Sequence, residues 1–462
     1  MRPSKGPNIV ALLTGACWII VARSADAQVV APHDAPPGET APHEAPSGET
    51  APHESETVPH EAPPGETAPH EGETVPHEAP PVVEAPAGEP AEPAPPAPAA
   101  ESQGPPPVTF GGYVEAFYSW NFGEPSNGIT HFRGFDNRHN SFTLANVALD
   151  AAWDLEGVVG RITLQVGHTP STYYLAEPSV AGAGGTNPSG AELWKYLQQA
   201  HAGYRFDVGG GLTVSAGLFL SPIGPESMAV HESWNWSRSH LFFGLPFYHT
   251  GLRATYAVSE AWSVTLAGYN GWNSVVDNND EKSVSAQLAF SRPDLAVSVL
   301  YFGGTERPTG APEGRGWRHT LDAHATWHAA PWASLLAHAN AGLEPTTFGL
   351  SHWAAGALSA RFRLLPEVFI AARGDAFYEH AATNDEGRAA AIFWPVPWVA
   401  SATATLDVRP HPQVSFRLEV RHDHAAGDLY FGGTVAGDGA GTPYAPNRAA
   451  QDTVTLGSTA WF

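Results

Sequence analysis

The residues best suited to chemistry lie close together in the segment 222–247. Carboxylates, imidazoles, indoles and a guanidinium occur there within a few positions: Glu226, His231, Glu232, Trp234, Trp236, Arg238 and His240. Glu232, Ser237 and His240 supply the residue types of a nucleophilic triad, but crowding them into one segment gives no triad geometry. The sequence also contains no Gly-x-Ser-x-Gly elbow, so we expect no enzyme. Such a segment could instead constrict a channel, and its aromatic rings would also suit contact with a sugar.

Histidine patterns raise the question of a metal site. His324 and His328 are four residues apart, which on a strand spreads them along one face. Within residues 28–107, His-Glu pairs recur at steps of ten or seven residues. Imidazole and carboxylate are ordinary ligands for zinc, nickel and copper, but a flexible chain does not hold them in fixed geometry. We expect no resident metal and no cofactor; weak metal capture by the repeat is the alternative.

Charged residues also recur at every second position of apolar stretches. In the segment 414–421 (VSFRLEVR), apolar and polar side chains alternate strictly, which is the pattern of a β-strand with one face of each kind. A soluble sandwich would have to bury these arginine-rich faces at high cost, whereas in a wide barrel they meet water. The residues that we expect to line such a channel are Glu115, Arg161, Arg205, Arg253, Asp322, Arg361, Arg363, Arg373, Asp375, Arg417, Glu419 and Arg421. The residues that we expect in a constriction loop are Glu226, Glu232, Trp234, Trp236 and Arg238. For each wall residue, an ion pair that merely braces the barrel is the alternative.

The same alternation predicts the fold. Short links and long links also alternate along the chain, with 344–352 among the long ones, as expected for periplasmic turns and external loops. The final segment, DTVTLGSTAWF, ends on an aromatic residue, as the closing strand of an outer-membrane barrel commonly does. The sequence therefore predicts an all-β fold, a transmembrane antiparallel β-barrel of about 16 strands. The predicted strands are 110–121, 141–154, 158–169, 196–207, 211–221, 248–257, 262–272, 283–291, 295–304, 318–329, 333–343, 353–364, 367–378, 398–408, 413–424 and 452–462.

Two segments precede the predicted barrel at 108–462. Residues 1–27 are typical of a signal peptide, with Arg2 and Lys5 before a short apolar run and a small-x-small cleavage site at its end. Cys17 lies inside this segment, so we expect the exported chain to lack cysteine. Residues 28–107 are rich in Pro, Glu and His, carry 15 acids and no Lys or Arg, and predict a disordered linker. The formal charge of the whole chain, −24, disfavours nucleic-acid binding.

Several motifs carry a family resemblance. They are GYVEAFY at 112–118, NRHNSF at 137–142, PIGPE at 222–226, NWSRS at 235–239 and PFYHTG at 246–251. With these motifs the chain resembles the beta-barrel porin-2 (OmpL-like) family of bacterial outer-membrane proteins over residues 108–462. The resemblance implies passive transport and names no substrate.

These observations predict a porin of the bacterial outer membrane. We expect passive diffusion of small hydrophilic solutes or ions through a water-filled barrel, with the segment 28–107 in the periplasm and in contact with the cell wall. A non-conducting barrel with a surface-recognition or cell-wall-tethering role is the alternative. The expected partners are outer-membrane lipid and the solutes. A homotrimer is a further expectation, since small outward residues such as Ala354, Gly356 and Ala360 could permit close contact; the same residues would equally suit lipid.

Overall fold

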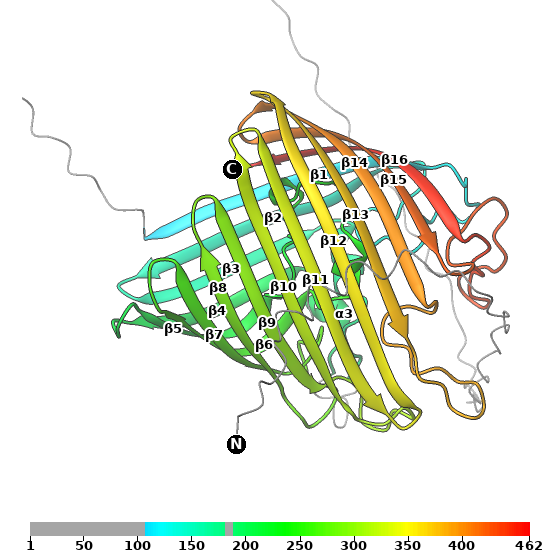
Figure 1. Ribbon diagram of the computed structural model, residues 1–462, viewed down its shortest axis with the longest axis horizontal. Coiled ribbons are helices and arrows are strands. Elements are labelled where there is room, and N and C mark those ends of the chain that lie inside the picture. The colour runs from blue at the N-terminus through cyan, green and yellow to red at the C-terminus, as the bar shows by residue number, and fades with distance from the viewer. Residues whose placement is uncertain (1–106, 181–187) are drawn as a thin grey trace, which may run out of the picture. The chain divides into compact units, whose positions relative to one another are not determined.

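The computed structural model describes residues 107–180 and 188–462. Within these residues, sixteen antiparallel strands close into a single barrel in which each strand pairs with its neighbours in sequence and β1 pairs with β16 (Figure 1). The predicted fold class is confirmed. The expectations for the signal peptide at 1–27 and for residues 28–106 of the linker lie outside the described residues.

The strand bounds follow the predicted segments closely. The strands are β1 Val108–Asn121, β2 Ser141–Leu155, β3 Val158–Val166, β4 Leu197–Phe206, β5 Leu212–Leu220, β6 Tyr248–Ala257, β7 Trp262–Tyr269, β8 Ser283–Ser291, β9 Leu295–Thr305, β10 Trp317–Ala330, β11 Ala333–Thr346, β12 Gly349–Leu365, β13 Val368–His380, β14 Trp398–His411, β15 Val414–Ala425 and β16 Ala450–Trp461. Short helical turns lie in the connections: α2 Thr169–Tyr173, α3 Ala191–Trp194, η2 Val230–Glu232 and α4 His240–Phe243. Among the described residues, no helix is long and apolar enough to span a membrane.

One predicted long loop, 344–352, is wrong. The β11–β12 ladder continues to the pair Thr346–Gly349 and leaves only residues 347 and 348 as a link. Gly349 has φ +128°, a left-handed conformation that glycine adopts without strain, so the chain can reverse tightly here. The turn-like composition of this stretch reflects a tight hairpin and not a long loop.

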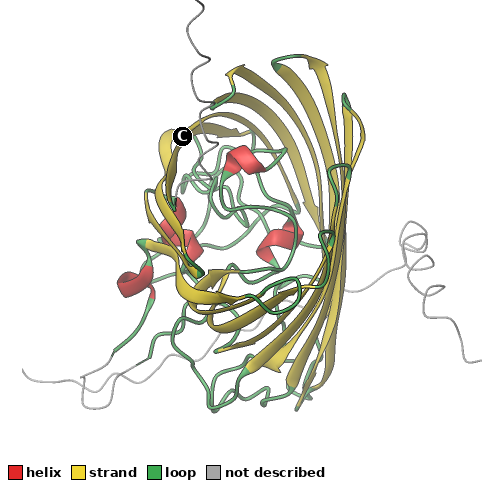
Figure 2. Ribbon diagram, turned by 90° about the vertical axis from the view of Figure 1, so that its left-hand side faces the viewer, coloured by secondary structure: helices red, strands yellow, loops and turns green. Residues whose placement is uncertain are grey.

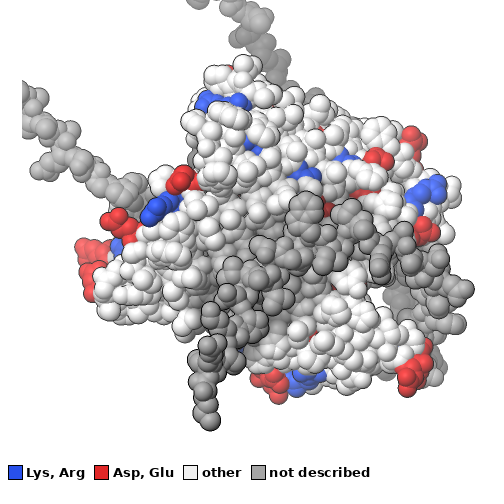
Figure 3. Space-filling view, in the orientation of Figure 1, with Lys and Arg blue, Asp and Glu red and all other residues white. Residues whose placement is uncertain are grey.

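The two faces of the wall meet different surroundings. On β15, Phe416, Leu418 and Val420 are 42–53% exposed on the outer face, whereas Arg417, Glu419 and Arg421 point inward and are at most 3% exposed. On the face shown in Figure 3, most of the described surface carries no charge, and charged residues gather mainly towards its margins. Exposed aromatic rings such as Trp332 and Trp398 lie at opposite strand ends, where a barrel meets the two membrane boundaries. This outer face is suited to lipid and the inner face to polar contacts.

Candidate functional site: the loop inside the barrel

The connection between β5 and β6 contains the loop 222–247, which lies within the ring of strands (Figure 2). Trp236, Arg238 and His240 are at most 4% exposed, although none of them belongs to a strand. Glu232 and Trp234 stay exposed and half-buried, respectively. The loop therefore presents one side to the wall and the other to the remaining interior.

Inward-facing carboxylates of the wall accept hydrogen bonds from the backbone of this loop. Glu419 on β15 accepts from the N–H groups of Trp236 (2.6 Å) and Ser237 (2.9 Å). Glu115 on β1 accepts from Val230 N–H at 2.5 Å. Asp375 on β13 accepts from His240 N–H at 2.9 Å. A buried N–H group needs an acceptor, and an ionised acceptor makes the stronger bond, so these carboxylates fix the path of the loop.

Inward-facing arginines hold the carbonyl groups of the same loop. Arg417 donates to the carbonyl oxygens of Val230 (3.0 Å), Asn235 (3.1 Å) and Ser233 (2.9 Å). Arg373 donates to Ser237 O at 2.7 Å and to Glu226 Oε1 at 3.0 Å. Arg421 donates to Arg238 O at 2.5 Å. Both signs of charge on β13 and β15 thus serve to anchor loop backbone, and these side chains face inward but are covered by the loop.

Apolar contacts reinforce the anchoring. The indole of Trp236 packs against Phe117, with ring centroids 6.0 Å apart, and lies directly over Gly457 of β16. A side chain at Gly457 would overlap this indole, so the glycine makes the close approach possible. Leu241 joins a buried cluster with Trp353 and Phe377 of the wall. The loop is held by packing as well as by charge.

Three further candidate wall residues, Arg161, Arg205 and Arg253, pair or stack with residues outside the loop 222–247. Arg161 pairs with Asp150 at 2.8 Å and Arg205 with Asp154 at 2.6 Å, both pairs half-exposed near the short-turn end of the barrel. Arg253 stacks over Phe219, with its guanidinium carbon 4.3 Å from the ring centroid.

Asp322 on β10 is buried and also holds the start of the loop 222–247. It accepts from Gly224 N–H at 3.2 Å and from Asn340 at 3.0 Å, and it pairs with His338 at 2.6 Å. His324 lies 3.4 Å from the same carboxylate, whereas His328 is hydrogen-bonded to Ser334 at 2.8 Å. The two histidines that are four residues apart therefore have different partners and form no common site. Across the residues that the structure describes, no cluster of three His, Cys, Asp or Glu could hold a metal ion.

A narrow recess separates the loop from β11–β13. It is lined by Glu226, Glu232, Trp234, Asn235, His338 and Arg373 and has a volume of about 40 Å³. That volume holds a few waters and no sugar ring. We therefore find no sugar site at this position.

The barrel sequence matches a known protein family. The family described as "Putative beta-barrel porin-2, OmpL-like" matches residues 107–462. The chain belongs to this family. No curated protein matches it.

Solved structures of outer-membrane proteins are similar in fold to this porin-2 family member. The outer membrane channel DcaP of Acinetobacter baumannii has a TM-score of 0.49 and 12% identity, covering 77% of this chain and 97% of that one. The anion-selective porin from Comamonas acidovorans has a TM-score of 0.46 and 11% identity, with 77% and 99% covered. The trimer form of OmpT of Vibrio cholerae has a TM-score of 0.48 and 8% identity, with the same coverage.

In this family member, sequence reasoning missed a second segment that reaches the same wall. Arg133 and Asp136, from the β1–β2 connection, are buried and paired with each other, and Arg133 also lies 3.4 Å from Asp423. Burial raises the pKa of Asp136, but the guanidiniums of Arg133, Arg421 and Arg238 lower it more, so its pKa lies below the ordinary value.

His240 was likewise overlooked as an anchoring residue. Its ring nitrogens lie 2.9 Å from Asp375 and 3.5 Å from Asp423. No spacing in the sequence signals contacts between residues so far apart in the chain.

Proposed function

We propose that this protein is an outer-membrane porin through which small hydrophilic solutes or ions diffuse passively, and that the loop 222–247 is its constriction. One observation carries the proposal: an irregular loop is fixed inside a closed barrel by hydrogen bonds to one arc of the inner wall. Glu419 on β15 accepts from the N–H groups of Trp236 and Ser237. Arg417, at the next inward position of the same strand, donates to the carbonyl groups of Val230, Ser233 and Asn235. A loop held in this way narrows the channel without blocking it completely.

The opposite arc supports an aqueous path. Thr213, Thr255, Thr265 and Gln287 form a row of cross-strand neighbours on β5 to β8. All four are only half-buried, unlike the covered side chains on β15. Neutral hydroxyl and amide groups at partly exposed inward positions are suited to water and to polar solutes. The charged arc that carries the loop therefore faces a row of neutral polar side chains, with Arg253 at the next inward position of β6.

The orientation follows from the connections. Val108 and Trp461 lie at the strand ends that are joined by short turns. In outer-membrane barrels short turns face the periplasm, so we propose that residues 28–107 are periplasmic and that the long connections face outward. This orientation assigns loop 222–247 to the external set of connections, folded inward.

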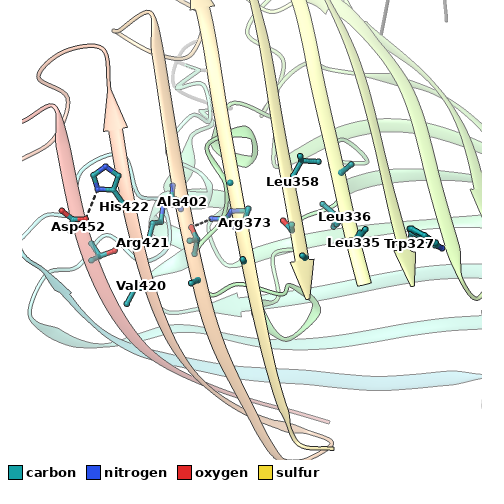
Figure 4. A pocket seen from close by; sticks show the side chains of 18 of the residues that line it. Trp327, Leu335, Leu336, Leu358, Arg373, Ala402, Val420, Arg421, His422 and Asp452 are labelled. Atoms are coloured by element: carbon teal, nitrogen blue, oxygen red, sulfur yellow. Dashed lines mark hydrogen bonds and ion pairs between the residues drawn. The ribbon is translucent and has the colours of Figure 1, made fainter. Parts of the chain in front are cut away.

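The outer face of β12–β14 is a candidate contact between copies. The pocket in Figure 4 is a depression on the outer side of β10–β16. It lies between the larger side chains of Leu358 and Val420, where the residues are small: Ala372, Gly374, Ala402 and Ala404. We propose a homotrimer packed through this face, because small side chains let two walls approach closely. Crosslinking in mild detergent should capture three copies; a monomer at all concentrations would overturn this assembly.

Single-channel recording in planar bilayers tests the proposed function. Purified, folded protein should produce stable, stepwise conductance, with steps of uniform size. A folded barrel that never conducts would overturn the porin proposal, and a recognition or structural role would then be the better account of the fold.

A further inference from the structure

We infer that the short-turn end of the lumen holds a binding site for an oxyanion, a phosphate or carboxylate group, formed by Arg361, Arg363 and Arg409. These three residues are called the arginine cluster below. The inference rests on the proposed function in one respect, since the anion is taken to be a solute that permeates the barrel. The binding itself does not require conduction.

Strand register assembles the arginine cluster. Arg363 on β12 lies opposite Phe369 on β13, and Phe369 lies opposite Asp407 on β14. Arg361 is two residues from Arg363 on β12, and Arg409 is two residues from Asp407 on β14. Because side chains alternate along a strand, both arginines point to the same inner face as this row. Four strand residues from two non-adjacent strands thus surround a single phenylalanine.

The ring of Phe369 brings the guanidiniums together. The guanidinium carbons of Arg361, Arg363 and Arg409 lie 4.0, 5.9 and 5.6 Å from its centroid. Cations stack on an aromatic face, but a ring carries no net charge and cannot neutralise them. Phe369 therefore gathers positive charge without balancing it.

Carboxylates in this region are too few to match the guanidiniums. Asp407 lies 2.9 Å from Arg409, 3.4 Å from Arg361 and 3.6 Å from Arg417. Arg361 and Arg409 thus share one carboxylate with Arg417, and among the described residues Arg363 forms no ion pair. Glu367 of the adjoining turn is exposed. At the same end of the barrel, by contrast, Arg161 and Arg205 each have an aspartate of their own.

Unused donors in the arginine cluster remain accessible. A guanidinium offers five N–H groups. Within the described chain, Arg361 uses one of them, towards Asp407. Arg363 uses two, both towards Pro366 O, and Arg409 uses two, towards Asp407 and His231 O. The side chains of Arg361 and Arg409 are 19% exposed, and Arg363 is exposed. The planar fork of arginine matches the paired oxygens of carboxylate and phosphate. Excess positive charge with free donors in a polar lumen is the chemistry of an oxyanion site.

Titration calorimetry on the full-length folded protein in detergent tests the site, with inorganic phosphate and acetate as separate probes. We expect saturable binding of at least one probe, weakened about tenfold or more in the triple variant R361Q/R363Q/R409Q, which corresponds to about 1.4 kcal/mol. The control is R292Q. Arg292 lies in the exposed β8–β9 turn, stacked 5.3 Å from the outward-facing Phe290, so its loss should leave binding unchanged.

A second variant separates charge from geometry and guards against misfolding. R361K/R363K/R409K keeps three positive charges but loses the guanidinium fork, and its affinity should lie between those of the unaltered protein and the glutamine variant. Absence of saturable binding in the unaltered protein, or equal affinity in the lysine variant and in any folded glutamine variant, would overturn the site.

Bilayer recordings distinguish this failure from failure of the porin proposal. A protein that binds phosphate but never conducts retains the site and loses the porin function. A protein that conducts but binds neither probe retains the porin function and loses the site. Where both hold, phosphate should reduce the chloride current of the unaltered channel and leave that of the glutamine variant nearly unchanged.

Discussion

Glu419 offers the sharpest test of the constriction. Its carboxylate, 1% exposed, accepts from Trp236 N–H at 2.6 Å, from Ser237 N–H at 2.9 Å and from the Thr405 hydroxyl at 2.7 Å. Replacing Glu419 with alanine leaves two buried N–H groups without an acceptor. The Thr405 O–H on the wall also loses its acceptor, although the Asn235 amide still donates to the Thr405 oxygen at 2.7 Å.

The magnitude for loop docking follows from the two donors that belong to the loop, the N–H groups of Trp236 and Ser237. A buried polar group left without a partner costs about 1–3 kcal/mol, so the docked loop should lose about 2–6 kcal/mol relative to a detached loop. Even the lower figure raises the detached population about 30-fold. The strand ladders do not involve this carboxylate, so the melting temperature of the barrel should change little.

Planar-bilayer recording measures the consequence. Channels of Glu419→Ala should show larger conductance and stronger open-channel noise than the unaltered protein, because the loop leaves the wall for part of the time. Asp452→Asn is the matched control. This substitution also removes a negative charge, but the Asp452 side chain faces outward and is 60% exposed. Among the described residues it pairs only with His422, so the conductance should not change.

A chemical readout covers the case in which conductance is ambiguous. The expected exported chain lacks cysteine, so a single Ala229→Cys substitution provides one labelling site in the loop, at a position that is 6% exposed. A water-soluble thiol reagent should label it faster when Glu419 is alanine. Equal conductance, equal noise and equal labelling rates in the two backgrounds would refute the assignment of Glu419 as an anchor of a lumenal constriction.

Three further outcomes are expected. Gly457→Leu should displace Trp236 and raise conductance and noise as Glu419→Ala does, because the new side chain overlaps the indole; an unchanged channel would contradict the packing. Because the pKa of Asp136 is lowered in the folded protein, its pairing with Arg133 stabilises the fold above the ordinary carboxyl pKa, and this stabilisation is lost as the pH falls through the folded pKa. The melting temperature, measured from about pH 7 to about pH 3, should therefore depend less on pH in Asp136→Asn than in the unaltered protein. Equal pH dependence in the two proteins would count against the pair. Deleting residues 28–107 should leave folding and conductance nearly unchanged and alter cell-wall association, whereas a much larger conductance would show that the segment plugs the channel.

The sequence by itself determined the barrel. Alternation such as that of 414–421 is visible in the chain because each strand separates an apolar surrounding from a polar one, and this constraint acts on every second residue. The same local rule predicted which side of β15 carries Arg417 and Glu419. It failed at 344–352, where composition indicated a loop but backbone pairing and the φ of Gly349 allowed a tight hairpin.

Only the tertiary structure decided what the inward residues contact. Glu419 and Trp236 are 183 positions apart, and parity shows that Glu419 points inward without showing that it accepts from a loop amide. The gathering of Arg361 and Arg409 around Phe369 likewise depends on the register of three strands. Alternation is set by each residue and its immediate neighbours, whereas register and loop docking are set by the closure of the whole barrel. Closure brings together residues whose separation in the chain carries no periodic signal.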